Sequence, residues 1–416
     1  MIERLQKMQM HLNNFGADRF AEEYYGKHFT GSMTIVDGKE TGTLFFRNGV
    51  IYDLKEGNPD PESGVDIGVT GSKEAWDFFP DVRRSLSAAI STHVENPNNN
   101  LAQVGTPLRL RQNFNPLAEV CRVYSCLRDG DDPLTDYVRD PENEALGLSS
   151  SVHGFYKKIN GTRIFCETNN GPTDKAVIIC CHTAGRDTRQ YHDMMDIFAD
   201  KYRMIAFDMP GHGKSWPMPG NKLVKNNEEY GKWIWDVIQS LGVKNPILIG
   251  CSMGGNIVYH MAYHYPIRAF VSMQGAYYTP ESVPGVLYFL NHPYISIQHS
   301  HKEYTECLIG TKTSQSRVDF IRWGVMSETA AAKYNDVALY FDFDMRDKIQ
   351  DIDVPALIIQ GMDDQMVTSK MAEETVSKMT NCKHIKYVPI EGFGHFIIVE
   401  SPEQVCNIID DFIQEL

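Results

Sequence analysis

A serine stands at the centre of the pentapeptide Gly250-Cys-Ser-Met-Gly254. A serine hydroxyl is a weak nucleophile at neutral pH, so an enzyme that uses one must hold it beside a general base and hydrogen-bond donors. The pentapeptide follows the apolar run Ile247-Leu-Ile and precedes a helical pattern that starts at Asn256. Because glycines on both sides of Ser252 allow a sharp turn from strand to helix, the stretch predicts a nucleophile on a strained turn.

Other residues with suggestive spacing have simpler interpretations. His260 and His264 stand four residues apart, as zinc ligands on a helix can, but position 261 is not the Glu of the zinc-protease motif, and helix packing is favoured. Gly213-Lys-Ser215 ends like a phosphate-binding loop, whereas Asp208 occupies the position of the leading glycine. We therefore expect neither a metal nor a cofactor.

The composition indicates a globular protein larger than one ordinary domain. The chain has 416 residues, of which 42% are hydrophobic and 23% charged. Its formal net charge of -14 argues against nucleic acid or an anionic membrane surface as a partner. No apolar run is long enough to span a membrane, and the first residues lack the pattern of a signal peptide. The nine scattered cysteines, with no Cys-x-x-Cys pair, indicate reduced thiols and a cytoplasmic protein.

Residues 1–128 predict a small α+β domain. A helical pattern opens the chain, and alternating apolar and polar residues over 32–36 and 43–46 predict strands, with a tight turn at Asn48-Gly49 before a third strand. Further strands are expected over 65–70 and 107–111, and helices around Trp76, over Arg84 to Val94 and near 115–127.

This order of elements over about residues 10–127 resembles a sterol-carrier-protein-2-type domain. The resemblance rests on the hairpin, on the stretch from Val65 to Trp76 and on the stretch from Val104 to Leu117. It implies an apolar tunnel able to hold a lipid or an acyl chain. The alternative is a lipid-free copy that packs on the enzyme or forms a homodimer.

Residues 129–151 are acidic, polar and proline-bearing, and they predict a linker. From 152 to 416, buried β-branched runs alternate with helical patterns, which predicts a mostly parallel sheet with helices on both faces. The segment 276–352 interrupts this alternation and is rich in aromatic residues. Because insertions of this length usually serve a function, we expect a helical cap over the serine.

The region from about 152 to the end resembles the α/β-hydrolase superfamily. The resemblance rests on five motifs in the order that this family has them: His182-Thr-Ala-Gly185, Asp208-Met-Pro-Gly-His-Gly-Lys-Ser215, the pentapeptide around Ser252, Gly361-Met-Asp-Asp-Gln-Met-Val367 and Gly392-Phe-Gly-His-Phe396.

The resemblance implies a Ser-Asp-His catalytic triad in the chain order of that fold. Ser252 would be the nucleophile and His395 the general base. The acid that orients His395 would be Asp363 or Asp364, and the family spacing Gly-x-x-Asp-x-x-Val favours Asp364.

The family also places an oxyanion hole at two backbone amides. One is expected at Met253, and the other at Thr183 or Ala184. The family commonly has His-Gly where this chain has His182-Thr183, so both residues stay open as the second donor.

The first hypothesis is a serine hydrolase that cleaves a largely apolar carboxylic ester through an acyl-enzyme. The alternative on the same fold is a carbon–carbon bond hydrolase of the meta-cleavage-product type, although such enzymes usually have Trp where this chain has Phe396. A hypothesis from another class is a lipid-binding or carrier protein in which the hydrolase domain is secondary.

Overall fold

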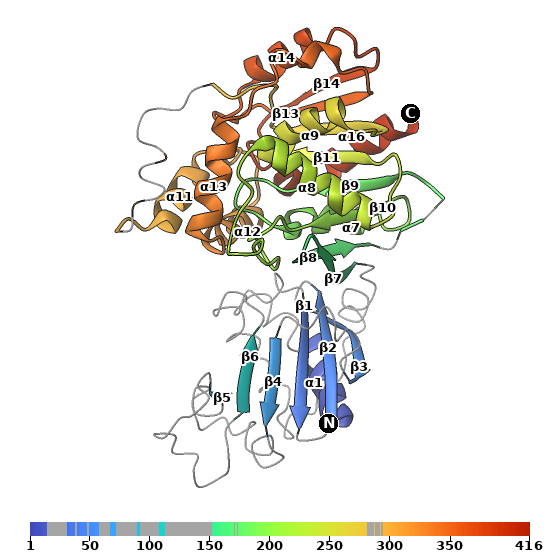
Figure 1. Ribbon diagram of the computed structural model, residues 1–416, viewed down its shortest axis with the longest axis vertical. Coiled ribbons are helices and arrows are strands. Elements are labelled where there is room, and N and C mark those ends of the chain that lie inside the picture. Colours follow the sequence, from blue (N-terminus) through green and yellow to red (C-terminus); the bar gives the residue numbers. More distant parts are fainter. Residues whose placement is uncertain are drawn as a thin grey trace. The chain divides into compact units, whose positions relative to one another are not determined.

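The computed structural model describes residues 1–14, 31–37, 40–47, 50–57, 67–71, 90–91, 108–112, 152–169, 171–172, 174–280, 287, 292 and 294–416. The chain divides into two compact units, Met1–Ser150 and Ser151–Leu416 (Figure 1). The predicted linker over 129–151 and the predicted helix near 115–127 lie outside the described residues.

The N-terminal unit contains helix α1 (Ile2–Asn14) and a six-stranded mixed sheet in the order β3-β2-β1-β4-β6-β5. Strands β1, β2 and β3 are antiparallel neighbours, whereas β1 pairs with β4 in parallel. The strands are β1 (Gly31–Asp37), β2 (Glu40–Arg47), β3 (Val50–Glu56), β4 (Ile67–Gly71), β5 (Ile90–Ser91) and β6 (Leu108–Gln112).

Helix α1 covers one face of this sheet. Leu5 and Met8 are fully buried, as are Met33 and Leu44 on the strands. Asn13 secures the end of the helix, because its side chain both donates to Ile51 O (2.7 Å) and accepts from Ile51 N (3.0 Å). The opening helix and the first strands are thus confirmed.

The helix predicted over Arg84 to Val94 is wrong at its centre. Ile90 and Ser91 form β5, which pairs in parallel with Leu108 and Arg109 of β6. Cross-strand pairing overrides the helical periodicity at these two residues. The predicted turn at Asn48-Gly49 and the residues around Trp76 lie outside the described residues.

The C-terminal unit is built on an eight-stranded sheet in the order β14-β13-β12-β11-β9-β10-β8-β7. Strands β7 and β8 form an antiparallel hairpin through Asn160 and Gly161, both with positive φ. Strand β8 pairs with β10 in the antiparallel sense, and the six strands β9 to β14 run parallel to one another. The strands are β7 (His153–Ile159), β8 (Thr162–Thr168), β9 (Val177–Cys181), β10 (Arg203–Phe207), β11 (Ile247–Cys251), β12 (Ala269–Met273), β13 (Ala356–Gly361) and β14 (Ile385–Ile390).

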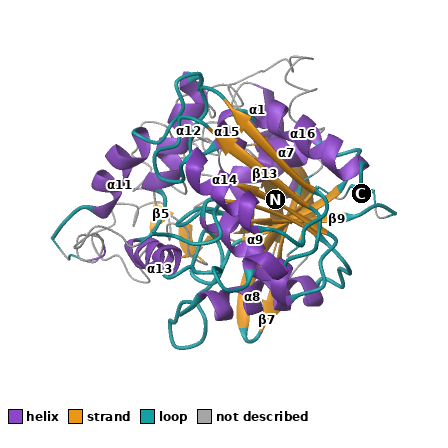
Figure 2. Cartoon of the chain, turned by 90° about the horizontal axis from the view of Figure 1, so that it is seen from above, coloured by secondary structure: helices purple, strands orange, loops and turns teal. Residues whose placement is uncertain are grey.

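Helices cover both faces of this sheet, as the alternating pattern predicts (Figure 2). One apolar core lies under α8 (Asn227–Ser240), α9 (Met253–His264) and α14 (Ser369–Lys378). The other lies under α7 (His192–Ile197), α15 (Ile397–Glu400) and α16 (Pro402–Gln414). Buried strands of this kind need apolar residues on both sides, and all five residues of β11 are buried.

Between β12 and β13 the described chain forms three helices, α11 (Ile297–Glu306), α12 (Gln315–Met326) and α13 (Ala330–Phe341), followed by a short 3-10 helix, η4 (Ile349–Asp351). They occupy the insertion in which the sequence predicts a helical cap. Within the described parts of the chain, no helix has the length and apolar character needed to cross a bilayer. Seven cysteines in those parts are free thiols, of which Cys307 alone is exposed.

Candidate active site

Ser252 occupies the turn between β11 and α9 in a strained backbone conformation, with φ 57° and ψ -119°. The flanking glycines are required by packing. A Cβ at Gly250 would lie 1.9 Å from the carbonyl oxygen of Gly254, and a Cβ at Gly254 would lie 2.2 Å from that of Cys181. The backbone therefore has room for this turn only with glycine at both positions.

The structure brings Ser252, His395 and Asp364 together in one hydrogen-bonded chain. His395 Nε2 lies 2.8 Å from Ser252 Oγ, and His395 Nδ1 lies 2.8 Å from Asp364 Oδ2. The three residues come from the loops after β11, β14 and β13, and each is only 2% exposed. Of the two neighbouring aspartates, Asp363 instead accepts hydrogen bonds from the amide and hydroxyl of Thr311, both at 2.8 Å.

Gln274 supports Asp364, and sequence reasoning missed it. Its Nε2 donates to Asp364 Oδ2 (2.8 Å), and its Oε1 accepts from the amide of Gly361 (2.6 Å). Gln274 has φ 47°, a left-handed conformation that is unusual for glutamine. A glutamine directly after the buried strand Ala269-Phe-Val-Ser-Met273 was the available signal.

Glu400 supports the loop that carries His395, and it too was missed. Its Oε2 accepts from the amides of Gly310 (2.8 Å) and Gly394 (2.9 Å), and its Oε1 accepts from the amide of Phe396 (2.8 Å). A buried carboxylate costs free energy unless it is satisfied in this way. The acid that ends the apolar run Ile397-Ile-Val was the signal in the sequence.

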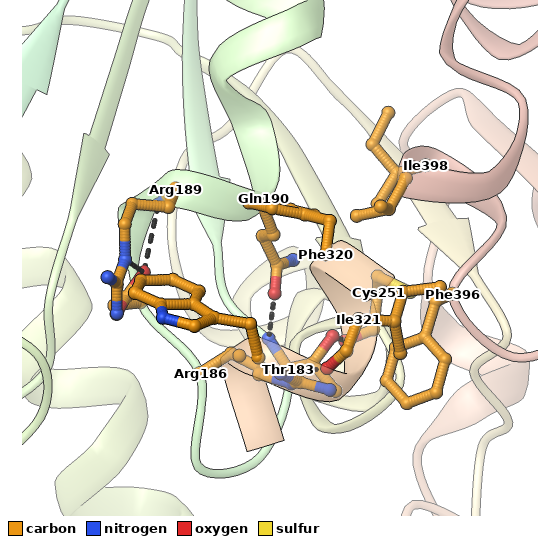
Figure 3. A pocket seen from close by; sticks show the side chains of 13 residues that line it. Thr183, Arg186, Arg189, Gln190, Cys251, Phe320, Ile321, Phe396 and Ile398 are labelled. Carbon is orange, nitrogen blue, oxygen red and sulfur yellow. Dashed lines mark hydrogen bonds and ion pairs between the residues drawn. The ribbon is translucent and has the colours of Figure 1, made fainter. Parts of the chain in front are cut away.

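The loop after β9 contains the two residues predicted as the second oxyanion donor. The amide of Thr183 donates to Gln190 Oε1 (3.1 Å), so it is already engaged (Figure 3). The amides of Ala184 and of Met253, the first residue of α9, have no acceptor among the described residues. His182 fixes the loop, because its Nε2 accepts from the amide of Met209 (3.1 Å).

Asp336, on cap helix α13, ties three segments together. Its Oδ2 accepts from the amide of Gly185 in the loop after β9 (2.7 Å) and lies 2.8 Å from His212 Nε2 in the turn after β10. Asp336 raises the pKa of His212 against the opposing effect of burial, and His212 in turn lowers the pKa of Asp336. Below the raised pKa of His212, the interaction is therefore a buried ion pair between the cap and the core.

Burial shapes the other titratable groups near Ser252. It lowers the pKa of His182 to about 4, so that imidazole is neutral at pH 7. It also raises the pKa of the adjacent Cys251 thiol to about 12, which disfavours a thiolate nucleophile. Burial and the proximity of His264 lower the pKa of His260 to about 4.

His260 packs against helix α8, where its ring would touch a Cβ at Gly231, and the ring centroids of His260 and His264 lie 4.3 Å apart. Among the described residues, no three His, Cys, Asp or Glu side chains form a group that could hold a metal ion.

A cavity of about 700 Å³ opens onto Ser252 and His395. This volume is typical of pockets for small organic ligands. The cap helices α11 and α13 and the start of α14 supply most of the remaining wall, which includes the apolar or aromatic residues Tyr304, Leu308, Val337, Tyr340, Phe341, Met366 and Met371.

The fold and this constellation of side chains define the class of protein. The family model described as alpha/beta hydrolase fold matches residues 176–402, more than half of the chain. The chain belongs to the α/β-hydrolase family.

Individual relatives are distant. The chain is 23% identical to 3-oxoadipate enol-lactonase 1 of Acinetobacter baylyi, over 59% of this chain and 92% of that protein. It is also 23% identical to the bifunctional esterase/perhydrolase DCH of Acinetobacter calcoaceticus, over 63% of this chain and 99% of that protein. Among solved structures, the enol-lactonase from Burkholderia xenovorans LB400 is similar with a TM-score of 0.56 and 18% identity, over 62% of this chain and all of that one.

Proposed function

We propose that this protein is a serine hydrolase that cleaves carboxylic esters, with Ser252, His395 and Asp364 as its catalytic triad. The observation that carries the proposal is the continuous hydrogen-bonded chain from Ser252 Oγ through His395 to Asp364, at 2.8 Å for each contact. Such a chain at the floor of a cavity is the arrangement that activates a serine hydroxyl.

The geometry suggests the following sequence of steps. His395 Nε2 takes the proton of Ser252 Oγ as that oxygen attacks the ester carbonyl, and Asp364 stabilises the imidazolium through Nδ1. The carbonyl oxygen gains negative charge, which the amides of Met253 and Ala184 stabilise. His395 then gives its proton to the leaving alcohol oxygen, and water hydrolyses the acyl-enzyme by the same route.

Ala184 is the better choice for the second oxyanion donor. The amide of Thr183 already donates to Gln190, and turning it toward a substrate would break that hydrogen bond. The amide of Ala184 has no such engagement among the described residues, and Ala184 lines the cavity beside Ser252.

Two named relatives support ester chemistry. One is an esterase, and the other is an enol-lactonase, whose lactone substrate is a cyclic ester. An ester bond is therefore a better first assay than an epoxide or a haloalkane.

Hydrolysis of p-nitrophenyl esters from acetate to decanoate tests the proposal. We expect the wild type to be active and Ser252→Ala to lower kcat by about 10⁴–10⁶. Ser377→Ala, an exposed serine on α14, is the matched control and should retain full activity. If no ester is hydrolysed but a coloured dienol-ketone acid is, the protein is a carbon–carbon bond hydrolase and the ester proposal is wrong.

For the N-terminal unit we propose a sterol-carrier-protein-2-like domain that binds a lipid or mediates a homodimer. The elements that carried the resemblance include β2, β3, β4 and β6, which lie in one sheet with apolar residues buried under α1. Native mass spectrometry of the full-length chain tests both roles, since a bound acyl lipid and a second subunit add distinct masses. A monomer that carries no lipid would contradict both.

A further inference from the structure

Two buried cationic side chains line the same cavity as Ser252 and His395. Arg186 lies in the loop after β9, and Lys333 lies on cap helix α13. Arg186 is 9% exposed and Lys333 is 6% exposed. Arginine and lysine are almost never this buried unless a counter-charge compensates them.

The hydrogen bonds of Arg186 are incomplete. Its Nη1 donates to the carbonyl oxygen of Ile321 (3.0 Å), and its guanidinium carbon lies 5.1 Å from the centre of the Phe396 ring (Figure 3). Its Nη2 is buried, and among the described residues it has no hydrogen-bond partner. A guanidinium donates best to a carboxylate, which can accept two parallel hydrogen bonds.

Lys333 points toward the loop that carries the proposed oxyanion donor. Its Nζ donates to the carbonyl oxygen of Ala184 (3.3 Å) and lies 3.8 Å from Glu328 Oε2. The side chain of Glu328 is only 1% exposed, and its other oxygen contacts His301 Nδ1. Glu328 is thus the carboxylate that faces both Lys333 and His301.

The two buried cationic side chains share one acidic neighbour at this end of the cavity. Asp336 is paired with His212, and burial lowers the pKa of His301 to about 4, which leaves that ring neutral at pH 7. Glu328 is the acidic side chain beside Lys333, and burial lowers the pKa of both Arg186 and Lys333, an effect that the proximity of Glu328 opposes. Nη2 of Arg186 has no hydrogen-bond partner among the described residues, and an anionic group of a ligand would supply one.

We propose that the substrate carries a carboxylate, which binds between Arg186 and Lys333 while Ser252 attacks a carbonyl carbon a few bonds away. The short separation follows from the contact of Lys333 with Ala184, because the same residue contributes the proposed oxyanion donor. The inference takes from the proposed function that the cleaved bond is an ester. It narrows the substrate class to esters of acids that bear a second, free carboxylate.

A matched pair of substrates isolates the charge. The anionic substrates are monomethyl succinate, monomethyl glutarate and monomethyl adipate. Each is compared with the methyl ester of the same length in which a carboxamide replaces the free carboxylate. Release of acid is followed by titration at constant pH. We expect the wild type to favour the anionic ester in kcat/KM by about tenfold or more at one chain length. Lys333→Met and Arg186→Met should each lower this preference by about tenfold.

Lys370→Met is the control for loss of a positive charge. Lys370 is exposed on α14 and does not line the cavity, so its substitution should leave the preference unchanged. If the wild type cleaves the anionic and the amide esters equally well and the variants keep that ratio, the carboxylate site is wrong while the hydrolase proposal stands.

Calorimetric binding to Ser252→Ala separates binding from turnover. We expect the anionic ester to bind about tenfold more tightly than the amide ester, and Lys333→Met in the same background to remove the difference. If the anionic ester binds more tightly in this way but the wild type hydrolyses neither ester, the carboxylate site is supported and the proposed ester cleavage is refuted. Equal binding of the two esters would overturn the inference.

Discussion

The two sides of the active-site cavity are held in different ways. On the sheet side, backbone turns fix the reacting groups, as the strained Ser252 between two obligatory glycines shows. On the cap side, buried charged residues of α13 reach the core, because Asp336 pairs with His212 and Lys333 donates to the carbonyl oxygen of Ala184. The sheet side depends on steric limits that few sequences satisfy, whereas the cap side depends on charge balance, which many combinations of residues could achieve.

This difference explains how much the sequence could predict. A turn that presents a nucleophilic serine needs glycines at fixed spacing, so the sequence alone predicts that Ser252 lies on a strand-to-helix turn. The hydrogen bond between His395 and Asp364 also followed from motif order. Pairing between Asp336 and His212, or between Lys333 and the carbonyl oxygen of Ala184, depends on tertiary contacts between distant segments that no local pattern encodes.

The largest predicted effect is on the sheet side, where the two neighbouring aspartates can be compared. Asp364→Asn should lower kcat by about 10⁴, because the amide would favour the wrong tautomer of His395. Asp363→Asn should change kcat by less than about threefold, because Asp363 contacts Thr311 instead. Steady-state kinetics on one p-nitrophenyl ester measures kcat of both variants. An equal loss of kcat in the two variants would mean that Asp364 is wrongly assigned as the acid of the triad.

On the cap side, Asp336→Asn should lower the free energy of unfolding by about 3 kcal/mol, since it leaves His212 as an uncompensated buried group. It should also lower kcat, because Asp336 holds the amide of Gly185 beside Ala184. Glu167→Gln removes the carboxylate of another buried histidine pair, that of His192, and should lower stability without changing kcat.

The same variant gives a pH test. The pKa of His212 is raised above its ordinary value of 6.5, so the ion pair stabilises the fold fully below that value and less as pH rises through the raised pKa. The lowered pKa of Asp336 preserves the pair until pH falls below the ordinary carboxyl value of 3.8. Urea unfolding should therefore show a larger difference between wild type and Asp336→Asn at about pH 6 than at about pH 9. A difference that does not vary with pH would contradict the ion pair.

Glu400→Gln tests how tightly the sheet side must be held. A carboxamide can accept through one atom only, so the amides of Gly310, Gly394 and Phe396 cannot all stay bonded. We expect kcat to fall by about 10–100-fold with little change in KM, because the His395 loop would shift. Glu403→Gln, an exposed position on α16, serves as the control. An unchanged kcat would show that the loop keeps its position without this carboxylate.

The smallest effect is expected from Gly324→Ala on α12. A Cβ there would lie 2.0 Å from Arg186 Nη1 and would displace the end of that flexible side chain while the fold is kept. The preference for anionic over amide esters should fall about threefold, less than for Arg186→Met, because the charge stays in the cavity. Met326→Ala, an exposed position on the same helix, should leave it intact. A preference that survives Gly324→Ala but not Arg186→Met would show that charge matters more than exact position.

Asp336 also limits how this enzyme could change over time. An insertion in a loop is usually free to be shortened, exchanged or lost, and new substrate ranges often arise in that way. Here one carboxylate of α13 bonds to the loop after β9, so removing that helix would also loosen the amides beside Ser252. Helix α12 also bonds to that loop, since the carbonyl oxygen of Ile321 accepts from Arg186 Nη1 (3.0 Å), whereas α11 has no hydrogen bond to it among the described residues. Diversification of the pocket is therefore expected to spare α12 and α13 and to concentrate in α11.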